Sequence, residues 1–352
     1  MSTDQIERTM KTSPASDAAV DRIRHALSRF DRRFLPVVGT VLTLVIMLGV
    51  GQARYSTDRV DFLSMKLISN LLVDNSYLLV VAIGMTFVIL TGGIDLSVGA
   101  VVALVGLVTA KLLLAGVPLP VVLVVAVLVG TACGSLIGVL VQRFEIQPFI
   151  ASLAVMFLAR GLANVVSVNS LGISDPGFSA IAAWSLKFGE GRQLWRINAS
   201  MLIALAVLLV AFFLLHYTRF GRTVYGLGSG DGGAAVKLMG LRGERARIWV
   251  YVLSGTCAGI AGVLFAFYTK SGFNLTGIGM ELDAIAAAVI GGTLLSGGVG
   301  FVLGTGAGVM VYGLIQVLIA REGLDSWWTR VFIGAVLLAF VILQRALSVR
   351  RR

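Results

Sequence analysis

Two glycine-rich segments interrupt apolar runs, and the first of them carries a carboxylate. The first glycine segment is Gly-Gly-Ile-Asp-Leu-Ser-Val-Gly at residues 92–99, and the second is Gly-Gly-Thr-Leu-Leu-Ser-Gly-Gly at residues 291–298. The apolar run from Tyr77 to Leu90 is too short to cross about 30 Å of hydrocarbon at roughly 1.5 Å per residue. Irregular backbone at membrane depth survives only inside protein or beside water, and short interrupted segments in transporters point to the translocation site.

Ionisable residues near these segments are functional candidates because they are costly in a membrane. Asp95 either lines the pathway or caps the following helix, a role that Ser97 could also fill. Arg160 lies deep in a later apolar run, and both pairing with Asp95 and snorkelling to the interface remain open. Asn164, one turn later, could bond a sugar hydroxyl or a neighbouring helix. The predicted pathway residues are Gly92, Gly93, Asp95, Ser97, Arg160, Asn164, Gly291, Gly292 and Ser296.

The sequence offers no catalytic or metal-binding constellation. Its two histidines, His25 and His216, fall in a polar tail and at the end of an apolar run, and no His/Glu helix motif occurs. It contains no Gly-rich phosphate loop ending in Lys-Ser or Lys-Thr. We therefore expect a transport subunit that is not an enzyme and carries no cofactor, powered by another chain or by a gradient. A self-sufficient secondary carrier or a channel is the alternative, weakened by the scarcity of intramembrane carboxylates.

Composition predicts an all-α polytopic membrane protein. The 352 residues are 57% hydrophobic and 13% charged, with a mean hydropathy of +0.92. The net charge of +11 is concentrated in the N-terminal tail, in residues 217–247 and at the C-terminus, which the positive-inside rule places in the cytoplasm. Part of this charge can contact anionic membrane lipid, and no nucleic-acid binding is expected. The polar N-terminus has no signal-peptide core, so the first span would insert the chain.

About ten transmembrane helices are expected in a single domain at residues 35–347, with a cytoplasmic N-terminal tail at 1–34 and a basic cytoplasmic C-terminus at 348–352. An even number of crossings puts both termini on the cytoplasmic side. Residues 62–76 could form a surface-lying or a partly inserted helix. The predicted spans are Leu35 to Gln52, Tyr77 to Gly92, Ser97 to Ala115, Pro118 to Val141, Pro148 to Ser167, Ser200 to His216, Ala246 to Tyr268, Leu282 to Gly292, Gly300 to Ala320 and Trp327 to Leu347.

Glycines at four-residue spacing predict close helix packing, at 130, 134 and 138, at 300, 304 and 308, and at 255 and 259. The two glycine segments also resemble a weak internal repeat in parallel orientation. Within residues 217–247, a short amphipathic stretch ending at Gly240 could dock on a peripheral ATPase or lie at the lipid headgroups. The predicted ATPase-coupling residues are Phe220, Gly221, Arg222, Ala234, Ala235, Lys237 and Gly240.

Several motifs together resemble the membrane permeases of bacterial ATP-binding-cassette (ABC) sugar importers, the ribose, xylose, arabinose and galactose group. The likeness covers nearly everything after Phe62. The motifs are Ala-Ile-Gly-Met-Thr at 82–86, the first glycine segment, Ile-Gln-Pro-Phe-Ile at 146–150, Arg-Gly at 160–161, Phe-Gly-Arg at 220–222 and Tyr-Val-Leu-Ser-Gly at 251–255. Residues 281–286, 289–300 and 324–329 are most similar to the galactofuranose-importing members.

This resemblance implies the ABC importer permease fold, with discontinuous helices at the two glycine segments, in the bacterial inner membrane. It implies a separate ATP-binding subunit that holds ATP and Mg, and a second permease subunit that is different or identical. It also implies a periplasmic sugar-binding protein and a monosaccharide cargo, with galactofuranose expected. By the same resemblance, residues 234–240 would be the coupling helix. The stretch at 229–233 is richer in glycine than the family form.

Overall fold

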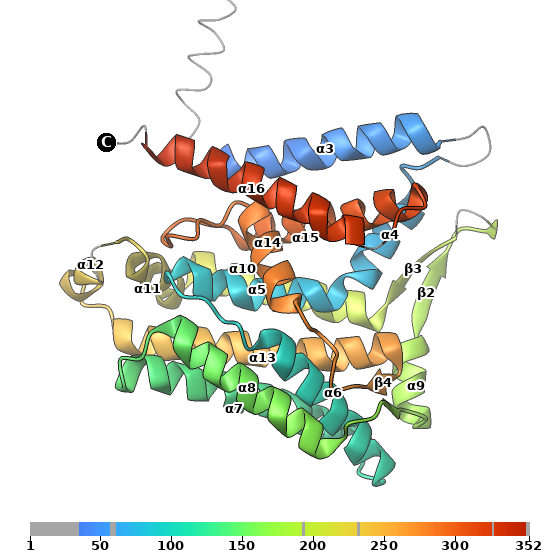
Figure 1. Cartoon of the computed structure of the whole chain (residues 1–352), viewed down its shortest axis with the longest axis horizontal. Helices are drawn as coiled ribbons and strands as arrows, with labels where there is room; N and C mark the ends of the chain where they lie inside the picture. Colours follow the sequence, from blue (N-terminus) through green and yellow to red (C-terminus); the bar gives the residue numbers. More distant parts are fainter. Residues whose placement is uncertain (1–34, 57–60, 192–193, 231–232, 326, 350–352) are drawn as a thin grey trace, which may run out of the picture. The chain divides into compact units, whose positions relative to one another are not determined.

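The computed structural model describes residues 35–56, 61–191, 194–230, 233–325 and 327–349. The predicted tail at 1–34 and the last three residues of the basic C-terminus lie outside this part of the chain. The described residues are mainly helical, and the strands are short (Figure 1).

Helices occupy all ten segments predicted as spans, with boundaries that differ by a few residues. These helices are α3 (Leu35–Tyr55), α5 (Ser76–Leu90), α6 (Val98–Leu114), α7 (Leu119–Arg143), α8 (Pro148–Val166), α10 (Ala199–Tyr217), α13 (Gly243–Thr269), α14 (Met280–Ile290), α15 (Val302–Arg321) and α16 (Trp327–Val349). Four shorter helices complete the described set: α4 (Met65–Asp74), α9 (Pro176–Ala183), α11 (Arg219–Leu227) and α12 (Ala234–Leu238).

Six of the described helices, α3, α7, α8, α10, α13 and α15, are long and apolar enough to cross a membrane. Helices α4 and α5 would form a seventh span if they act as one bent element, because they meet at an angle of 62°. The apolar helix α6 and the apolar part of α16 are shorter. The all-α polytopic class is therefore confirmed, whereas the number of ten crossings and the depth of the glycine segments stay predictions.

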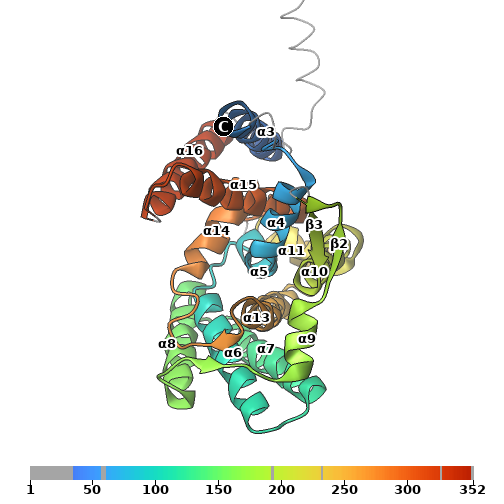
Figure 2. The ribbon, with the colours of Figure 1, turned by 90° about the vertical axis from the view of Figure 1, so that its right-hand side faces the viewer.

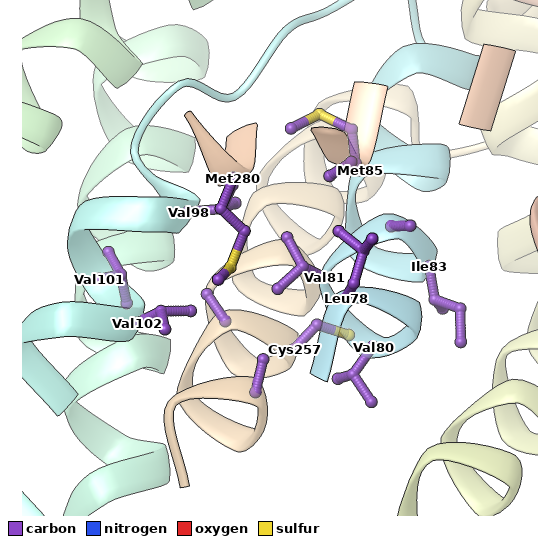
Figure 3. Packing of buried hydrophobic residues seen from close by; sticks show 14 of the residues in the cluster. Leu78, Val80, Val81, Ile83, Met85, Val98, Val101, Val102, Cys257 and Met280 are labelled. Atoms are coloured by element: carbon purple, nitrogen blue, oxygen red, sulfur yellow. The ribbon is translucent and has the colours of Figure 1, made fainter. Parts of the chain in front are cut away.

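Helix α5 lies at the centre of the described structure. In Figures 1 and 2 it lies between α15 and α13, and it contacts both of them as well as α10 and α14. Its residues from Leu78 to Leu90 are all buried, as expected for a helix that is apolar on every face. Figure 3 shows Val81 of this helix close to Cys257 of α13 and Met280 of α14.

Glycine packing joins α7 to α13, as the four-residue spacing predicted. A Cβ atom added to Gly130 would lie 2.6 Å from the Cα of Gly259, and one added to Gly134 would lie 2.9 Å from the Cα of Gly255. The backbones therefore touch directly, a contact that only glycine permits. The glycines of α7 therefore pack against another helix of the same chain.

Two small antiparallel sheets lie in regions that the sequence analysis left without structure. Strands β1 (Leu171–Gly172) and β4 (Ser271–Gly272) pair across about 100 residues of chain. Strands β2 (Ser185–Phe188) and β3 (Trp195–Asn198) form a hairpin in which the rings of Phe188 and Trp195 stack with centroids 4.5 Å apart.

Candidate translocation site

The first glycine segment begins where α5 ends in a Schellman motif. The Gly93 N–H donates to the Val88 carbonyl at 3.1 Å, and the Gly92 N–H donates to the Ile89 carbonyl at 2.8 Å. Gly92 has a φ of +79°, in the left-handed region that residues with a Cβ avoid. The Gly-Gly pair therefore stops the helix and satisfies its last carbonyls.

The second glycine segment repeats this ending on α14. The Thr293 N–H donates to the Ala288 carbonyl at 3.0 Å, and the Gly292 N–H donates to the Val289 carbonyl at 2.9 Å. Gly292 has a φ of +94°, also left-handed. The backbone thus gives the predicted internal repeat a physical basis, since both segments end a helix by one hydrogen-bond pattern.

The two glycine segments meet at the carbonyl of Leu90. The Gly298 N–H donates to this oxygen at 2.9 Å, and a Cβ on Gly297 would lie 2.9 Å from the Gly92 nitrogen. Gly228, at the end of α11, completes the junction, because a Cβ there would overlap both Leu90 O and Gly298 N. We call Leu90, Gly92, Gly228, Gly297 and Gly298 the glycine junction. A Cβ on Gly228, Gly297 or Gly298 would collide with the backbone of a neighbouring segment.

Helix α11 contacts the regions next to both glycine segments through aromatic residues. The ring of Phe220 stacks on Phe87 of α5, with centroids 6.1 Å apart. The Tyr225 hydroxyl donates to the Gly300 carbonyl, just beyond the second segment, at 2.7 Å. The predicted loop at 217–247 therefore contains a helix that rests on both interruptions.

Helix α12 presents an exposed tip and a buried base. Val236 is buried in a cluster with Leu227 and Ala246, which fixes α12 against α11 and α13. Leu238, at the tip, is 90% exposed. The buried anchor therefore holds an apolar side chain out at the surface.

The predicted coupling residues divide between these two helices. Phe220, Gly221 and Arg222 lie on α11, with Gly221 packed on the Leu215 carbonyl. Ala234, Ala235 and Lys237 lie on α12, and Gly240 follows it with a left-handed φ of +66°.

Asp95 is fully buried and bonded to two serines. Its Oδ1 accepts from the Ser97 N–H at 2.9 Å and from the Ser97 hydroxyl at 2.7 Å. Its Oδ2 accepts from the Ser254 hydroxyl of α13 at 2.7 Å. The carboxylate therefore satisfies the amide that precedes α6 and ties the first glycine segment to α13.

Arg160 donates hydrogen bonds to the loop before α14, whereas Asp95 accepts hydrogen bonds from serines. Its Nη1 donates to the backbone carbonyls of Asn274 at 2.5 Å and Thr276 at 2.8 Å. Asn164 accepts from the Asn274 side-chain amide and donates to the Arg160 carbonyl at 3.1 Å. The pairing of Asp95 with Arg160, one of the possibilities left by the sequence, is thus replaced by two separate networks. Arg160 and Asn164 hold the loop that leads into α14.

The remaining predicted pathway residues lie around the second segment. Gly291 packs against Gly304 of α15, where a Cβ would lie 2.6 Å from the Thr305 nitrogen. Ser296 is exposed. The buried Thr293 hydroxyl has no hydrogen-bond partner among the described residues. The structure therefore brings Gly92 close to the second segment, while Arg160 and Asn164 belong to another network.

Three contributors to this site were missed from the sequence. Ser254 lies 159 residues from Asp95, and Asn274 lies 110 residues from Asn164, so no local pattern could reveal these bonds. Helix α11 did carry a local signal. Thr218 stands three residues before the Gly221 amide that it caps, at a distance of 3.3 Å.

Comparisons with known proteins define the class of this chain. It is 39% identical over 321 residues to the fructose import permease protein FruG of Bifidobacterium longum, covering 90% of this chain and 93% of that protein. It is 44% identical over 327 residues to the inner membrane ABC transporter permease protein YjfF of Escherichia coli, covering 90% and 94%. It is 35% identical over 315 residues to the ribose import permease protein RbsC of Escherichia coli, covering 90% and 95%. No solved structure matches the chain.

The apolar helices and these relatives define a multi-pass membrane permease. Residues 67–341 match the family described as branched-chain amino acid transport system / permease component, and the chain belongs to that family. The expected resemblance to ABC sugar permeases is confirmed at the level of the family.

Proposed function

We propose that this chain is the membrane-spanning subunit of an ABC importer that moves a monosaccharide into the bacterial cytoplasm. The observation that carries the proposal is that the end of α11 contacts both glycine segments. The neighbouring helix α12 exposes the apolar side chain of Leu238. Such a loop can transmit movement from a peripheral ATPase to two helix interruptions at once. The relatives support the cargo class, because their names include fructose, ribose and allose import or transport.

The partners follow from this proposal. A separate ATP-binding subunit would hold ATP and Mg and dock on residues 234–240, with a second permease subunit, different or identical, alongside. A periplasmic sugar-binding protein would deliver the cargo. The chain would lie in the inner membrane with both termini and residues 217–247 in the cytoplasm, in keeping with their basic charge.

Alternating access is the proposed mechanism. Closure of the ATPase subunits would move α12, and the buried cluster around Val236 would pass this movement to α11. The glycine junction would then shift the ends of α5 and α14 together, since all three segments are in backbone contact. A neutral cargo is consistent with the Asp95 carboxylate and the Nη1 atom of Arg160 making their hydrogen bonds within the protein.

Galactofuranose is the proposed cargo within the monosaccharide class, on the strength of the motifs at residues 281–286, 289–300 and 324–329. The test is uptake of labelled galactofuranose, ribose, fructose and allose by the assembled importer in vesicles. Preferred uptake of galactofuranose would support the assignment. Preferred uptake of another sugar would overturn it while leaving the importer class intact.

Reconstitution tests the importer class. The purified chain alone should transport no sugar, and addition of its ATPase and permease partners with ATP should start uptake. Uptake by the chain alone would instead identify a self-sufficient carrier or a channel.

The docking role of α12 is tested by Leu238→Asp. A charge on this exposed apolar tip should reduce sugar-stimulated ATP hydrolysis and uptake together. Val168→Asp is the matched control, since Val168 is 66% exposed in the loop after α8, opposite the coupling loop in the predicted topology. Full coupled transport by Leu238→Asp would remove the docking assignment.

A further inference from the structure

A polar cavity lies beside the first glycine segment. Its volume is about 420 Å³, and it lies between the end of α5, the loop from α7 to α8, and the first turns of α13. Pockets for small ligands fall in the range of about 300–1,000 Å³, so the space suits a molecule of monosaccharide size. The cavity residues that matter here are Gly93, Gln142, Glu145, Gln147, Arg247 and Tyr251.

The cavity wall offers hydrogen-bonding groups of several kinds. Gln142 and Gln147 provide amides, Glu145 a carboxylate, Arg247 a guanidinium and Tyr251 a phenol. The Gln142 Oε1 atom is buried and accepts no hydrogen bond from the described residues. An unpartnered buried acceptor costs free energy, and a ligand hydroxyl that donates to it would recover that cost.

Gly93 keeps the phenol of Tyr251 at the cavity. A Cβ on Gly93 would overlap the Tyr251 hydroxyl oxygen, so any other residue would displace it. The same glycine donates the bond that ends α5. The cavity wall is therefore built partly from the helix ending itself, and a shift of that ending would change the cavity.

A second cavity of about 440 Å³ shares part of this wall. It is lined by Gln142, Glu145 and Arg247 and extends to Val236 and Lys237 of α12. The shared residues place the first cavity on the same side as the coupling loop. A ligand released from the first cavity would thus leave past the elements that the ATPase is proposed to move.

We infer that the cavity of about 420 Å³ beside Gly93 is a low-affinity site for a neutral monosaccharide on the cytoplasmic half of the pathway. The inference rests on the proposed function. Amides and a carboxylate match the paired donors and acceptors of adjacent sugar hydroxyls, and Tyr251 supplies an apolar ring with a polar tip. Glu145 and Gln147 are exposed and form its rim.

Protection of an introduced cysteine tests the site. Gln147→Cys in the assembled importer would be labelled with a thiol reagent during titration with galactofuranose, ribose or fructose. Arg143→Cys is the matched control, because Arg143 is exposed at the end of α7 and does not line the cavity. Unsubstituted importer gives the background from Cys133 and Cys257.

A transported sugar at about ten times its dissociation constant should slow labelling of Gln147→Cys about tenfold and leave Arg143→Cys unchanged. Adding Gln142→Leu should raise the sugar concentration for half-protection about tenfold, whereas Arg143→Leu should not. If the importer transports a sugar that gives no protection, the cavity is not a sugar site. If wild-type importer transports none of the sugars, the proposed function itself fails.

Discussion

The two glycine segments share a backbone ending but differ in how their side chains are held. Asp95 of the first segment accepts three hydrogen bonds from two serines. In the second segment the Thr293 hydroxyl is buried without a partner among the described residues, and Leu295 and Ser296 are exposed. The first segment is therefore fixed to α13 by side-chain hydrogen bonds, whereas the second is held by backbone contacts with Leu90 and Gly304. This difference indicates that one helix ending can be anchored by side chains in one place and by backbone contacts in another.

The largest expected effect follows removal of the Asp95 carboxylate. Asp95→Ala leaves three buried donors without an acceptor and should destabilise the protein by about 2–5 kcal/mol. Thr293→Val, the matched change in the second segment, removes a hydroxyl that has no described partner and should be close to neutral. Thermal unfolding of the purified variants measures both.

Asp95→Asn keeps one acceptor oxygen, so its loss of stability should lie between those of wild type and Asp95→Ala. If Asp95→Ala and Thr293→Val lowered the unfolding midpoint equally, the proposed contrast between the two segments would be wrong.

Gly92→Ala and Gly292→Ala should each lower stability by less than Asp95→Ala, and by equal amounts. Each places a Cβ on a left-handed residue and should cost roughly 1 kcal/mol. Gly49→Ala is the control, since nothing lies within 4 Å of the added Cβ in that helix and its φ is not left-handed. Clearly unequal losses in the unfolding free energy would contradict the shared ending.

The smallest effect on stability is expected at the end of α15, the helix that follows the second segment. Glu322 follows this helix and bonds Arg54 of α3, with Nε to Oε1 at 2.5 Å and Nη2 to Oε2 at 3.1 Å. The hydrogen bonds from Arg54 and Tyr55 lower the pKa of Glu322 from 4.5 to about 2. Because the folded pKa lies below the unfolded one, the stabilisation is present above pH 4.5 and is lost as the pH falls toward 2.

The unfolding midpoints of wild type and Glu322→Gln should therefore converge on acidification across this range. The difference should be small even at neutral pH, because the ion pair is exposed. Asp325→Asn, at another exposed carboxylate nearby, is the control. A difference that grows as the pH falls would contradict the assigned role of Glu322.

Much of the fold could be predicted from local patterns. Apolar runs located the ten helices, because burial and lipid contact both demand continuous apolar sequence. The Gly-Gly pairs predicted the ends of α5 and α14, since a left-handed residue is needed there. Glycine spacing likewise predicted close helix packing at residues 130–138 and 255–259, although it did not predict that these two stretches pack on each other.

Long-range partners could not be predicted. Whether Asp95 bonds Arg160 or Ser254 depends on which helices become neighbours, and this is set by packing of the whole bundle. Arg160 donates to main-chain carbonyls. Every residue carries such a carbonyl, so the residue types in the sequence could not reveal the partners of Arg160. Glycine junction formation has the same origin, because Gly228 and Leu90 lie far apart in the chain.

The central claim is that the coupling loop acts on both glycine segments through the glycine junction. Uptake per ATP hydrolysed by the assembled importer tests it most directly, with Gly228→Ala as the variant and Gly161→Ala as a control in open space. Tyr225→Phe, which removes only the bond to Gly300, covers the case in which Gly228→Ala fails to assemble. We predict that ATP hydrolysis continues while uptake per ATP falls about tenfold or more for Gly228→Ala and by less for Tyr225→Phe. Unchanged uptake per ATP in either assembled variant would contradict the account.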